Sequence, residues 1–388
     1  MIIVKNFQVD KFQKIRTPFY YYDTTLLDET LQTIKSEMDS NMHLHYAVKA
    51  CANPKVLQHI SGHGFGADCV SGGEIQACLN AGFPASGIVF AGVGKSDWEI
   101  ELGLEAGIFC FNVESIPELE VISEIAQRKG KTARVALRIN PNVGAHTHAN
   151  ITTGLAENKF GIDMQDMEYV IGMARGLKNI LLVGLHFHIG SQILEMDDFK
   201  AECLRINELQ DRLESHGITG IENINVGGGL GIDYQNPDEK PIPNFHDFFD
   251  TYRQNIQLRP GQQLHFELGR AVVGQCGNLI ARVLYIKSNA IKNFCIVDAG
   301  MTDLIRPALY DAYHKVENLT PDVDAQTVRY DVVGPICESS DVFVKDYEMP
   351  QTQRGDLIAF RSAGAYGEIM ASRYNCRQLP IGYTTEDI

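Results

Sequence analysis

The chain contains no block of consecutive basic residues. Its 49 acidic side chains outnumber the 34 basic ones, which gives a net charge of −15. Nucleic acids and anionic membranes are bound through clustered lysine and arginine, so neither is expected as a partner. An acidic small molecule would need arginines placed locally against this negative field.

The nine cysteines include no Cys-x-x-Cys pair, and their odd number and scatter through apolar runs predict reduced thiols. No stretch approaches the length of a transmembrane helix, and the first residues, Met1–Asn6, lack the apolar core of a signal peptide. These features together predict a cytoplasmic protein.

Internal repeats, low-complexity segments and long linkers are also missing from the sequence. The hydrophobic fraction of 44% and the charged fraction of 21% are those of an ordinary globular protein. A length of 388 residues suggests two domains, or one large domain with an appendage. Because no linker separates them, two domains are expected to pack tightly.

What the sequence does contain is an alternation of strand-like and helix-like segments from about residue 24 to 275. Eight apolar runs predict strands: His43–Ala50, Gly66–Val70, Ile88–Gly92, Ile108–Val113, Arg134–Asn140, Leu181–His188, Asn223–Val226 and Leu264–Glu267. Helical patterns separate most of them: Pro54–Ile60, Gly73–Ala81, Asp97–Ala106, Ile116–Lys129, Met164–Leu177 and Asp197–His216. Helices between consecutive strands force a parallel sheet, and eight such units predict an α/β fold with a closed (β/α)8 barrel. A doubly wound open sheet is the alternative, but it usually has fewer strands and a glycine-rich turn after its first strand.

Beyond residue 275 the helical pattern fades, and β-like runs separated by turn residues predict a second, mostly β domain. The runs are Leu279–Lys287, Phe294–Asp298, Val328–Val333 and Asp356–Phe360. We therefore expect a barrel over residues 24–275 and a β domain over 276–388, joined by the N-terminal segment 1–23.

Polar residues end most of the predicted barrel strands. They are Lys49, Asp68, Arg138, Asn140, His188, the three glycines Gly227, Gly228 and Gly229, and Glu267. Barrels of this kind keep their active sites at the carboxyl ends of the strands, so these residues are expected to meet at one mouth.

Taken singly, each of these residues has an ordinary structural explanation. Lys49 could extend its stem from an apolar strand to solvent, and His188 could be a buried imidazole satisfied by a backbone carbonyl. The glycine run Gly227–Gly229 could be only a tight turn. His186 shares the strand face of His188, so a metal pair is an alternative, but no His-Glu-x-x-His or comparable spacing accompanies it, and we expect no metal.

Taken together, the same residues supply the parts needed to hold pyridoxal 5'-phosphate. Lys49, in an apolar pocket, would have a depressed pKa and attach the aldehyde. His188 offers a ring to stack, and the three glycines leave their amides open to a phosphate. Glu267 is costly to bury without a partner, which a protonated pyridine nitrogen would provide.

The β domain carries a second group of candidates. Cys337 and Glu338 lie in one turn, and Arg306 is followed by a proline that stiffens the backbone carrying it. Tyr310 and Tyr366 add two phenols. As alternatives, Cys337 could be core filling like most cysteines, and Arg306 an ordinary surface cation.

These segments make the chain resemble the fold-type III pyridoxal-phosphate-dependent decarboxylases, and among them the diaminopimelate decarboxylases. The resemblance runs from about Pro18 to Pro380. It rests on Tyr46–Ala50, Gly66–Glu74, Lys159–Gly161, His188–Gln192, Asn225–Gly231, Asp298–Tyr313, Gly334–Asp341 and Gly364–Asn375. It implies an alanine-racemase-like barrel with a second β domain, and decarboxylation of meso-2,6-diaminopimelate to L-lysine and CO2.

The resemblance also implies roles for individual residues. The cofactor would be bound by Lys49, Asp68, His188, Ser191, Gly227, Gly228, Gly229, Glu267, Leu268, Gly269, Arg270 and Tyr366. The amino-acid substrate would be bound by Arg270, Arg306, Tyr310, Glu338 and Tyr366. Cys337 would be the proton donor, supplied by the partner subunit of a homodimer. Leu268 stands where this family usually has proline, and we expect that difference to loosen the turn before Arg270.

Two alternatives remain at this point. A decarboxylase of carboxynorspermidine would be similar overall but is expected to lack an arginine at the position of Arg270. A catalytically inactive binding protein of the same fold, like the antizyme inhibitors, would have no reason to keep both Lys49 and Cys337.

Overall fold

The computed structural model describes residues 7–141 and 159–388, and these divide into two compact units. The barrel unit comprises Leu31–Gly231 and Asn244–Gly269. The β unit comprises the described residues through Thr30 together with Ile232–Pro243 and Arg270–Ile388. The division differs from the expected boundaries chiefly at Ile232–Pro243, a segment within the predicted barrel that belongs to the β unit.

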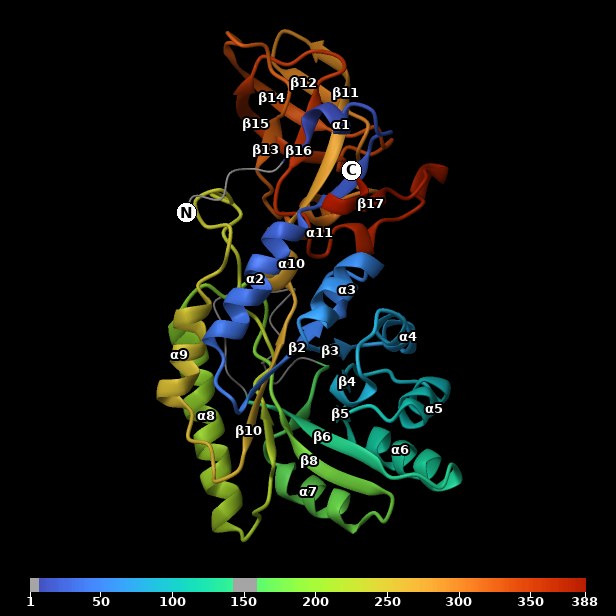
Figure 1. The fold of residues 1–388 in the computed structure, drawn as a ribbon, viewed down its shortest axis with the longest axis vertical. Helices are drawn as coiled ribbons and strands as arrows, with labels where there is room; N and C mark the ends of the chain where they lie inside the picture. The colour runs from blue at the N-terminus through green and yellow to red at the C-terminus, as the bar shows by residue number, and fades with distance from the viewer. Residues whose placement is uncertain (1–6, 142–158) are drawn as a thin grey trace. The chain divides into compact units, whose positions relative to one another are not determined.

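The barrel unit is a closed ring of eight parallel strands, which confirms the predicted (β/α)8 barrel (Figure 1). The strands are β2 (Met42–Ala47), β3 (Gly66–Cys69), β4 (Ile88–Phe90), β5 (Cys110–Val113), β6 (Ala133–Asn140), β8 (Ile180–His186), β9 (Asn223–Asn225) and β10 (Gln263–Leu268). The ring closes because β5 pairs with β6 and β10 pairs with β2. A short strand, β7 (Ile162–Asp163), adds to β6. Most strand residues are buried, as expected for a sheet covered on both faces.

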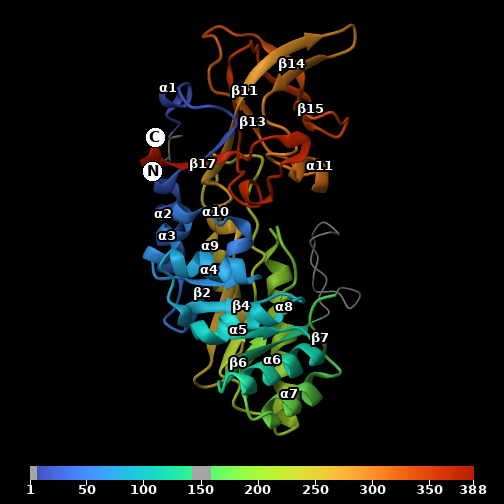
Figure 2. The same ribbon diagram turned by 90° about the vertical axis from the view of Figure 1, so that its right-hand side faces the viewer.

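Helices on the outside of the ring connect these strands (Figures 1 and 2). They are α3 (Pro54–Gly62), α4 (Gly72–Asn80), α5 (Asp97–Ala106), α6 (Ile116–Arg128), α7 (Met167–Gly176), α8 (Met196–Ser215) and α9 (Phe245–Asn255). The helix α9 was not predicted. Its signal was present, because Asn244 caps the helix by accepting from the Asp247 amide, and aromatic residues at i, i+3, i+4 and i+7 are buried.

The β unit contains an eight-stranded sheet, which confirms the mostly β second domain. Its strands are β1 (Phe19–Tyr22), β11 (Gly277–Ser288), β12 (Asn293–Val297), β13 (Val316–Asn318), β14 (Thr327–Val333), β15 (Val342–Pro350), β16 (Leu357–Phe360) and β17 (Ile381–Thr384). The N-terminal strand β1 pairs with β11 and β17. Short helices α1 (Val9–Phe12), α10 (Arg270–Val273) and α11 (Arg306–Tyr310) complete the unit, and α2 (Thr24–Glu37) runs from it into the barrel unit.

Over the described residues, none of the helices is both long enough and apolar enough to cross a membrane. The same residues contain no group of three or more His, Cys, Asp and Glu side chains that could hold a metal ion.

Candidate active site

Glu267, in β10, is a buried carboxylate that accepts three hydrogen bonds from side chains on three other strands. Its Oε1 accepts from Nδ2 of Asn112 (3.0 Å) on β5 and Nδ2 of Asn225 (2.7 Å) on β9. Its Oε2 accepts from Nε2 of His186 (2.9 Å) on β8. Burial would raise the pKa of Glu267, but the imidazole of His186 and the ammonium of Lys49 outweigh it and hold that pKa well below its usual range. The barrel therefore contains a fixed anion.

The sequence predicted Glu267 but missed the side chains that hold it. His186 was considered as a partner of His188 in a metal site, whereas its ring bonds to Glu267. Asn112 was not singled out, although it is a polar residue in an apolar strand and is completely buried. Buried amides of this kind need partners, and that requirement was the available signal.

Lys49 lies in a 3-10 turn, Val48–Ala50, directly after β2. Its Nζ is 3.7 Å from Oδ2 of Asp68, at the carboxyl end of the neighbouring strand β3. The Lys49 side chain is 43% exposed while Asp68 is fully buried. The apolar pocket that we expected around Lys49 is therefore wrong, because the residue faces buried carboxyl groups.

Asp68 differs from Glu267 in having no hydrogen-bond partner for either carboxyl oxygen among the described residues. Burial and the negative charge of Glu267 raise its pKa well above the usual range, and the charge of Lys49 opposes them only in part. Asp68 and Glu267 thus lie at the carboxyl ends of the barrel strands with pKa values shifted in opposite directions. Strongly shifted pKa values of this kind are typical of catalytic sites.

His188 follows β8, and its Nδ1 accepts a hydrogen bond from the backbone N–H of Gly228 (3.2 Å). That bond leaves the proton on Nε2. Burial, with the charges of Arg138 and Lys49, lowers the pKa of His188 well below its usual range, so the ring is neutral. An amide of the glycine run is thus one partner of this ring.

The glycine run after β9 is packed too closely to accept side chains. A Cβ on Gly228 would lie 1.9 Å from the Glu267 carbonyl oxygen, and one on Gly227 would lie 2.5 Å from that of Phe187. Gly227 and Gly229 also have positive φ (68° and 116°). The amides of Gly227 and Gly228 are used internally, by Asn225 Oδ1 and His188 Nδ1. Of the three amides, only that of Gly229 makes no hydrogen bond with described residues, so the cradle offers fewer amides than expected.

Leu268 is the last residue of β10, buried and paired with Tyr46 of β2. Leucine at this position continues the strand to its end, directly before the turn at Gly269. The following Gly269 brings the backbone against the turn that carries Lys49. A Cβ there would lie 3.0 Å from Cβ of Ala50 and 3.1 Å from Cβ of Ala47.

The β unit holds a second cluster, formed by two buried arginines and one phenol. Arg270, at the start of α10, donates from Nη1 to the hydroxyl oxygen of Tyr234 (2.7 Å), and its guanidinium lies 4.9 Å from the ring centre of Tyr366. Arg306, at the start of α11, donates from Nη1 to the same Tyr234 oxygen (3.0 Å). Tyr310 ends α11 half-buried. Tyr234 was not predicted as a site residue.

Cys337 and Glu338 are exposed on the turn after β14. The Cys337 amide donates to Oδ1 of Asn375 (3.5 Å), and Glu338 Oε1 accepts from the Tyr374 hydroxyl (2.5 Å). All of these residues belong to the β unit. Within the β unit, the predicted residues thus lie in two places: around Tyr234, and on the exposed turn that carries Cys337 and Glu338.

The barrel cluster fits pyridoxal phosphate. Glu267 is an ionised, buried carboxylate without a full counter-charge in contact, which suits a protonated pyridine nitrogen. Lys49 provides an accessible amine, His188 a neutral ring and Gly229 an amide for a phosphate oxygen. Ser191 lies in the loop after β8, next to Gly190, whose carbonyl oxygen would lie 2.8 Å from a Cβ on Gly229.

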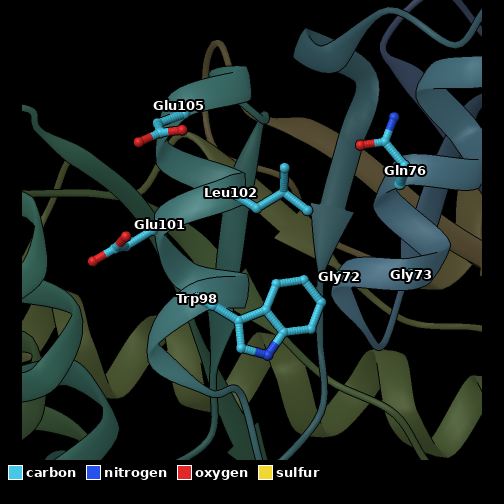
Figure 3. Close-up of a pocket in the computed structure, with 7 residues that line it drawn as sticks. All are labelled: Gly72, Gly73, Gln76, Trp98, Glu101, Leu102 and Glu105. Carbon is cyan, nitrogen blue, oxygen red and sulfur yellow. The ribbon is translucent and has the colours of Figure 1, made fainter.

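A separate surface groove of about 450 Å³ lies between α4 and α5 (Figure 3). Trp98 is exposed there and its ring packs against Gly72, where a Cβ would lie 2.5 Å from it. Glu101 and Glu105 point from α5, and each is 2.9 Å from Nζ of Lys129. The groove is lined by none of the predicted site residues, so it is not the candidate site.

Comparison with known proteins gives a consistent result. The family "Pyridoxal-dependent decarboxylase, pyridoxal binding domain" matches residues 25–274. The chain is 65% identical to a diaminopimelate decarboxylase of Bacteroides thetaiotaomicron over 98% of this chain and 99% of the relative. It is 44% identical to one of Neisseria meningitidis serogroup B, over 93% and 86%.

A solved structure, the Helicobacter pylori diaminopimelate decarboxylase complexed with L-lysine, superposes with a TM-score of 0.91. It is 40% identical and the match covers 98% of this chain and 94% of that one. A full-length match at this level of identity, joined to a mouth that fits pyridoxal phosphate, places the chain among the diaminopimelate decarboxylases of the fold-type III pyridoxal-dependent decarboxylase family.

Proposed function

We propose that the chain decarboxylates meso-2,6-diaminopimelate to L-lysine and CO2, the last step of lysine biosynthesis, with pyridoxal phosphate as cofactor. The observation that carries this proposal is the pair of buried guanidiniums, Arg270 and Arg306, in a chain of net charge −15. A substrate with a carboxylate at each end needs local cations of this kind. The 65% identity to a diaminopimelate decarboxylase supports the same substrate.

In the proposed reaction the bound cofactor supplies an electron-withdrawing ring next to the carbon that loses its carboxylate. Lys49 would hold the cofactor through its side-chain amine. Glu267, kept ionised by its three donors, would pair with a protonated ring nitrogen. The neutral ring of His188 would pack against the cofactor without adding a charge. Gly229 and Ser191 would bind the phosphate.

The far end of the substrate carries a second ammonium and a second carboxylate, and specificity is proposed to arise there. Arg306 binds the carboxylate through charge-assisted hydrogen bonds and Glu338 binds the ammonium. Arg270, Tyr310 and Tyr366 complete the substrate and phosphate contacts. A substrate that ends in an amine alone would leave Arg306 buried without an anion.

We also propose a homodimer in which each active site is shared, with Cys337 of one chain supplying a proton to the substrate bound at the barrel mouth of the other. Cys337 and Glu338 are exposed, and the hydrogen bonds that position them come from their own unit. A C2 pair would bury these side chains at a second chain's barrel mouth. We keep residence in the cytoplasm as part of the proposal, since nine free cysteines suit a reducing compartment.

One assay tests the proposed reaction. The purified protein with added cofactor is incubated with meso-diaminopimelate or with carboxynorspermidine, and the amine products are separated. Release of L-lysine from the first substrate alone is expected. Turnover of carboxynorspermidine alone would reassign the substrate. The Lys49→Ala variant is the blank, and turnover of neither substrate above that blank would contradict the proposal that the protein is a decarboxylase.

A further inference from the structure

The environment of Arg306 has a property that the proposed reaction does not require by itself: the hydrogen-bond acceptors around this buried cation are neutral. Nη1 of Arg306 donates to the Tyr234 hydroxyl oxygen (3.0 Å) and to Nε2 of His314 (2.9 Å). Its guanidinium also lies 5.1 Å from the centre of the Tyr234 ring. No carboxylate among the described residues pairs with it, although Arg306 is only 6% exposed.

The protonation state of His314 is fixed by its two partners. Its Nδ1 donates to the backbone carbonyl of Arg361 (2.9 Å), which leaves Nε2 as the acceptor for Arg306. Burial, together with the charge of Arg306, lowers the pKa of His314 to about 3. The imidazole is therefore neutral at any working pH, and it holds Arg306 in place without cancelling its charge.

Tyr234 links this arrangement to the second arginine. Its hydroxyl oxygen accepts from Nη1 of both Arg270 (2.7 Å) and Arg306 (3.0 Å), which uses both oxygen lone pairs. Its ring packs edge-on against His314, with ring centres 5.3 Å apart. A phenol bridges two guanidiniums that would otherwise repel each other, and it does so again without adding negative charge.

The bonds that hold Arg306 all leave from one nitrogen, Nη1. Among the residues that the structure describes, Nε and Nη2 of Arg306 donate to none. The edge formed by Nε and Nη2 matches the two oxygens of a carboxylate. Burying a cation costs free energy unless an anion pairs with it. The arrangement therefore favours the binding of an anionic ligand.

We propose that Tyr234 and His314 are positioning residues that make the site specific for a substrate with a distal carboxylate. They orient Arg306 through Nη1, keep its charge uncompensated and leave its Nε–Nη2 edge for the carboxylate. The inference rests on the proposed function, because it takes Arg306 to face the substrate. Because Tyr234 and His314 are neutral, they hold Arg306 in place without taking up the charge that the substrate carboxylate needs.

The test compares two ligands that differ at the distal end. L-Lysine keeps the carboxylate beside the distal ammonium, and cadaverine has the same chain without it. Binding of each to the cofactor-loaded protein is measured by calorimetry, and inhibition of decarboxylation gives a second value. For wild type we expect L-lysine to bind and cadaverine to bind at least about tenfold more weakly, since a hydrogen bond to a charged group contributes at least that factor.

Three variants separate positioning from packing. Tyr234→Phe keeps the ring but removes the shared acceptor, and His314→Leu removes the acceptor for Arg306 alone. His314→Gln keeps both an acceptor and a donor and is the conservative control. Tyr234→Phe and His314→Leu should raise the Kd of L-lysine and the KM of diaminopimelate about tenfold, with the Kd of cadaverine and the cofactor absorption unchanged. His314→Gln should retain most of the wild-type preference.

Equal weakening of both ligands in Tyr234→Phe and His314→Leu would reduce these residues to a packing role and overturn the inference, as would no change for either ligand. In both cases wild type would still release lysine from diaminopimelate, and the proposed function would stand. A wild-type protein that neither binds L-lysine nor turns over diaminopimelate would instead contradict the proposed function itself.

Discussion

Replacement of Glu267 by glutamine removes one charge from the barrel while leaving its hydrogen-bond network satisfiable. The glutamine oxygen can accept from Asn112 and Asn225, as Oε1 does in the wild type. The amide NH2 then faces Nε2 of His186, which can accept once its proton moves to Nδ1. Nδ1 has no described acceptor, so one buried N–H is left unsatisfied. Loss of a buried charge offsets this cost, and we expect a folded protein with a melting temperature within a few degrees of wild type.

The catalytic effect should be much larger. A carboxylate about 4 Å from a unit positive charge contributes about 4 kcal/mol at the effective dielectric of a protein site. If that interaction acts fully in the transition state, its loss lowers kcat about a thousandfold. The assay is kcat at saturating cofactor and diaminopimelate, with the melting curve and cofactor absorption recorded for the same sample.

The matched control is Glu202→Gln, which makes the same substitution at another buried glutamate of the barrel unit, on α8. It should leave kcat near wild type. A folded Glu267→Gln protein that keeps more than a tenth of wild-type kcat would show that the fixed anion of the barrel is not used in the reaction.

Four further outcomes are expected. Lys49→Ala should abolish turnover and borohydride fixation of the cofactor while the protein still folds, and residual activity above a few per cent would remove Lys49 from its role. Glu338→Gln should weaken diaminopimelate binding with the cofactor spectrum intact, whereas a collapsed spectrum would make Glu338 part of the cofactor pocket. Lys49→Ala and Cys337→Ala homodimers, each inactive, should recover about one quarter of wild-type activity after subunit exchange, because half of the dimers then contain one intact site. No recovery after proven exchange would contradict the shared site. Burial raises the pKa of Glu202 to about 8 from 4.5, so between these values the folded chain binds a proton that the unfolded chain has lost. The free energy of unfolding should therefore fall as pH rises through that window, and pH-dependent melting of Glu202→Gln should lack this component.

The residues that could be predicted from the sequence are those whose position along a strand carries the information. Lys49, Asp68, His188 and Glu267 stand at or just past strand ends, and parallel strands in a barrel bring their carboxyl ends together. The barrel itself was also predictable, because the alternation between strand-like and helix-like patterns can be read from neighbouring residues in the sequence.

The residues that were missed depend on which distant segments become neighbours. Asn112 looks like an isolated polar residue until β5 and β10 face the same interior, and Tyr234 looks like a loop tyrosine until Arg270 and Arg306 both reach it. The environment of Lys49 was misjudged because its sequence neighbours are apolar while its spatial neighbour Asp68 is not. Pair contacts of this kind are fixed by closure of the fold, which no local pattern encodes.

The hydrogen-bond network around Glu267 also determines when, during synthesis and folding of the chain, this carboxylate can be stabilised. Its donors lie 155, 81 and 42 residues before it in the sequence, so the anion has no stabilising partners in place until β5, β8, β9 and β10 have come together. Lys49 leaves the ribosome long before Glu267 does. A partly synthesised chain can thus present the amine but not the carboxylate, and closing the long loops between the donors precedes any gain from them. We therefore expect the cofactor to bind after the barrel has closed and not to act as a folding nucleus. Added cofactor should slow unfolding without accelerating refolding.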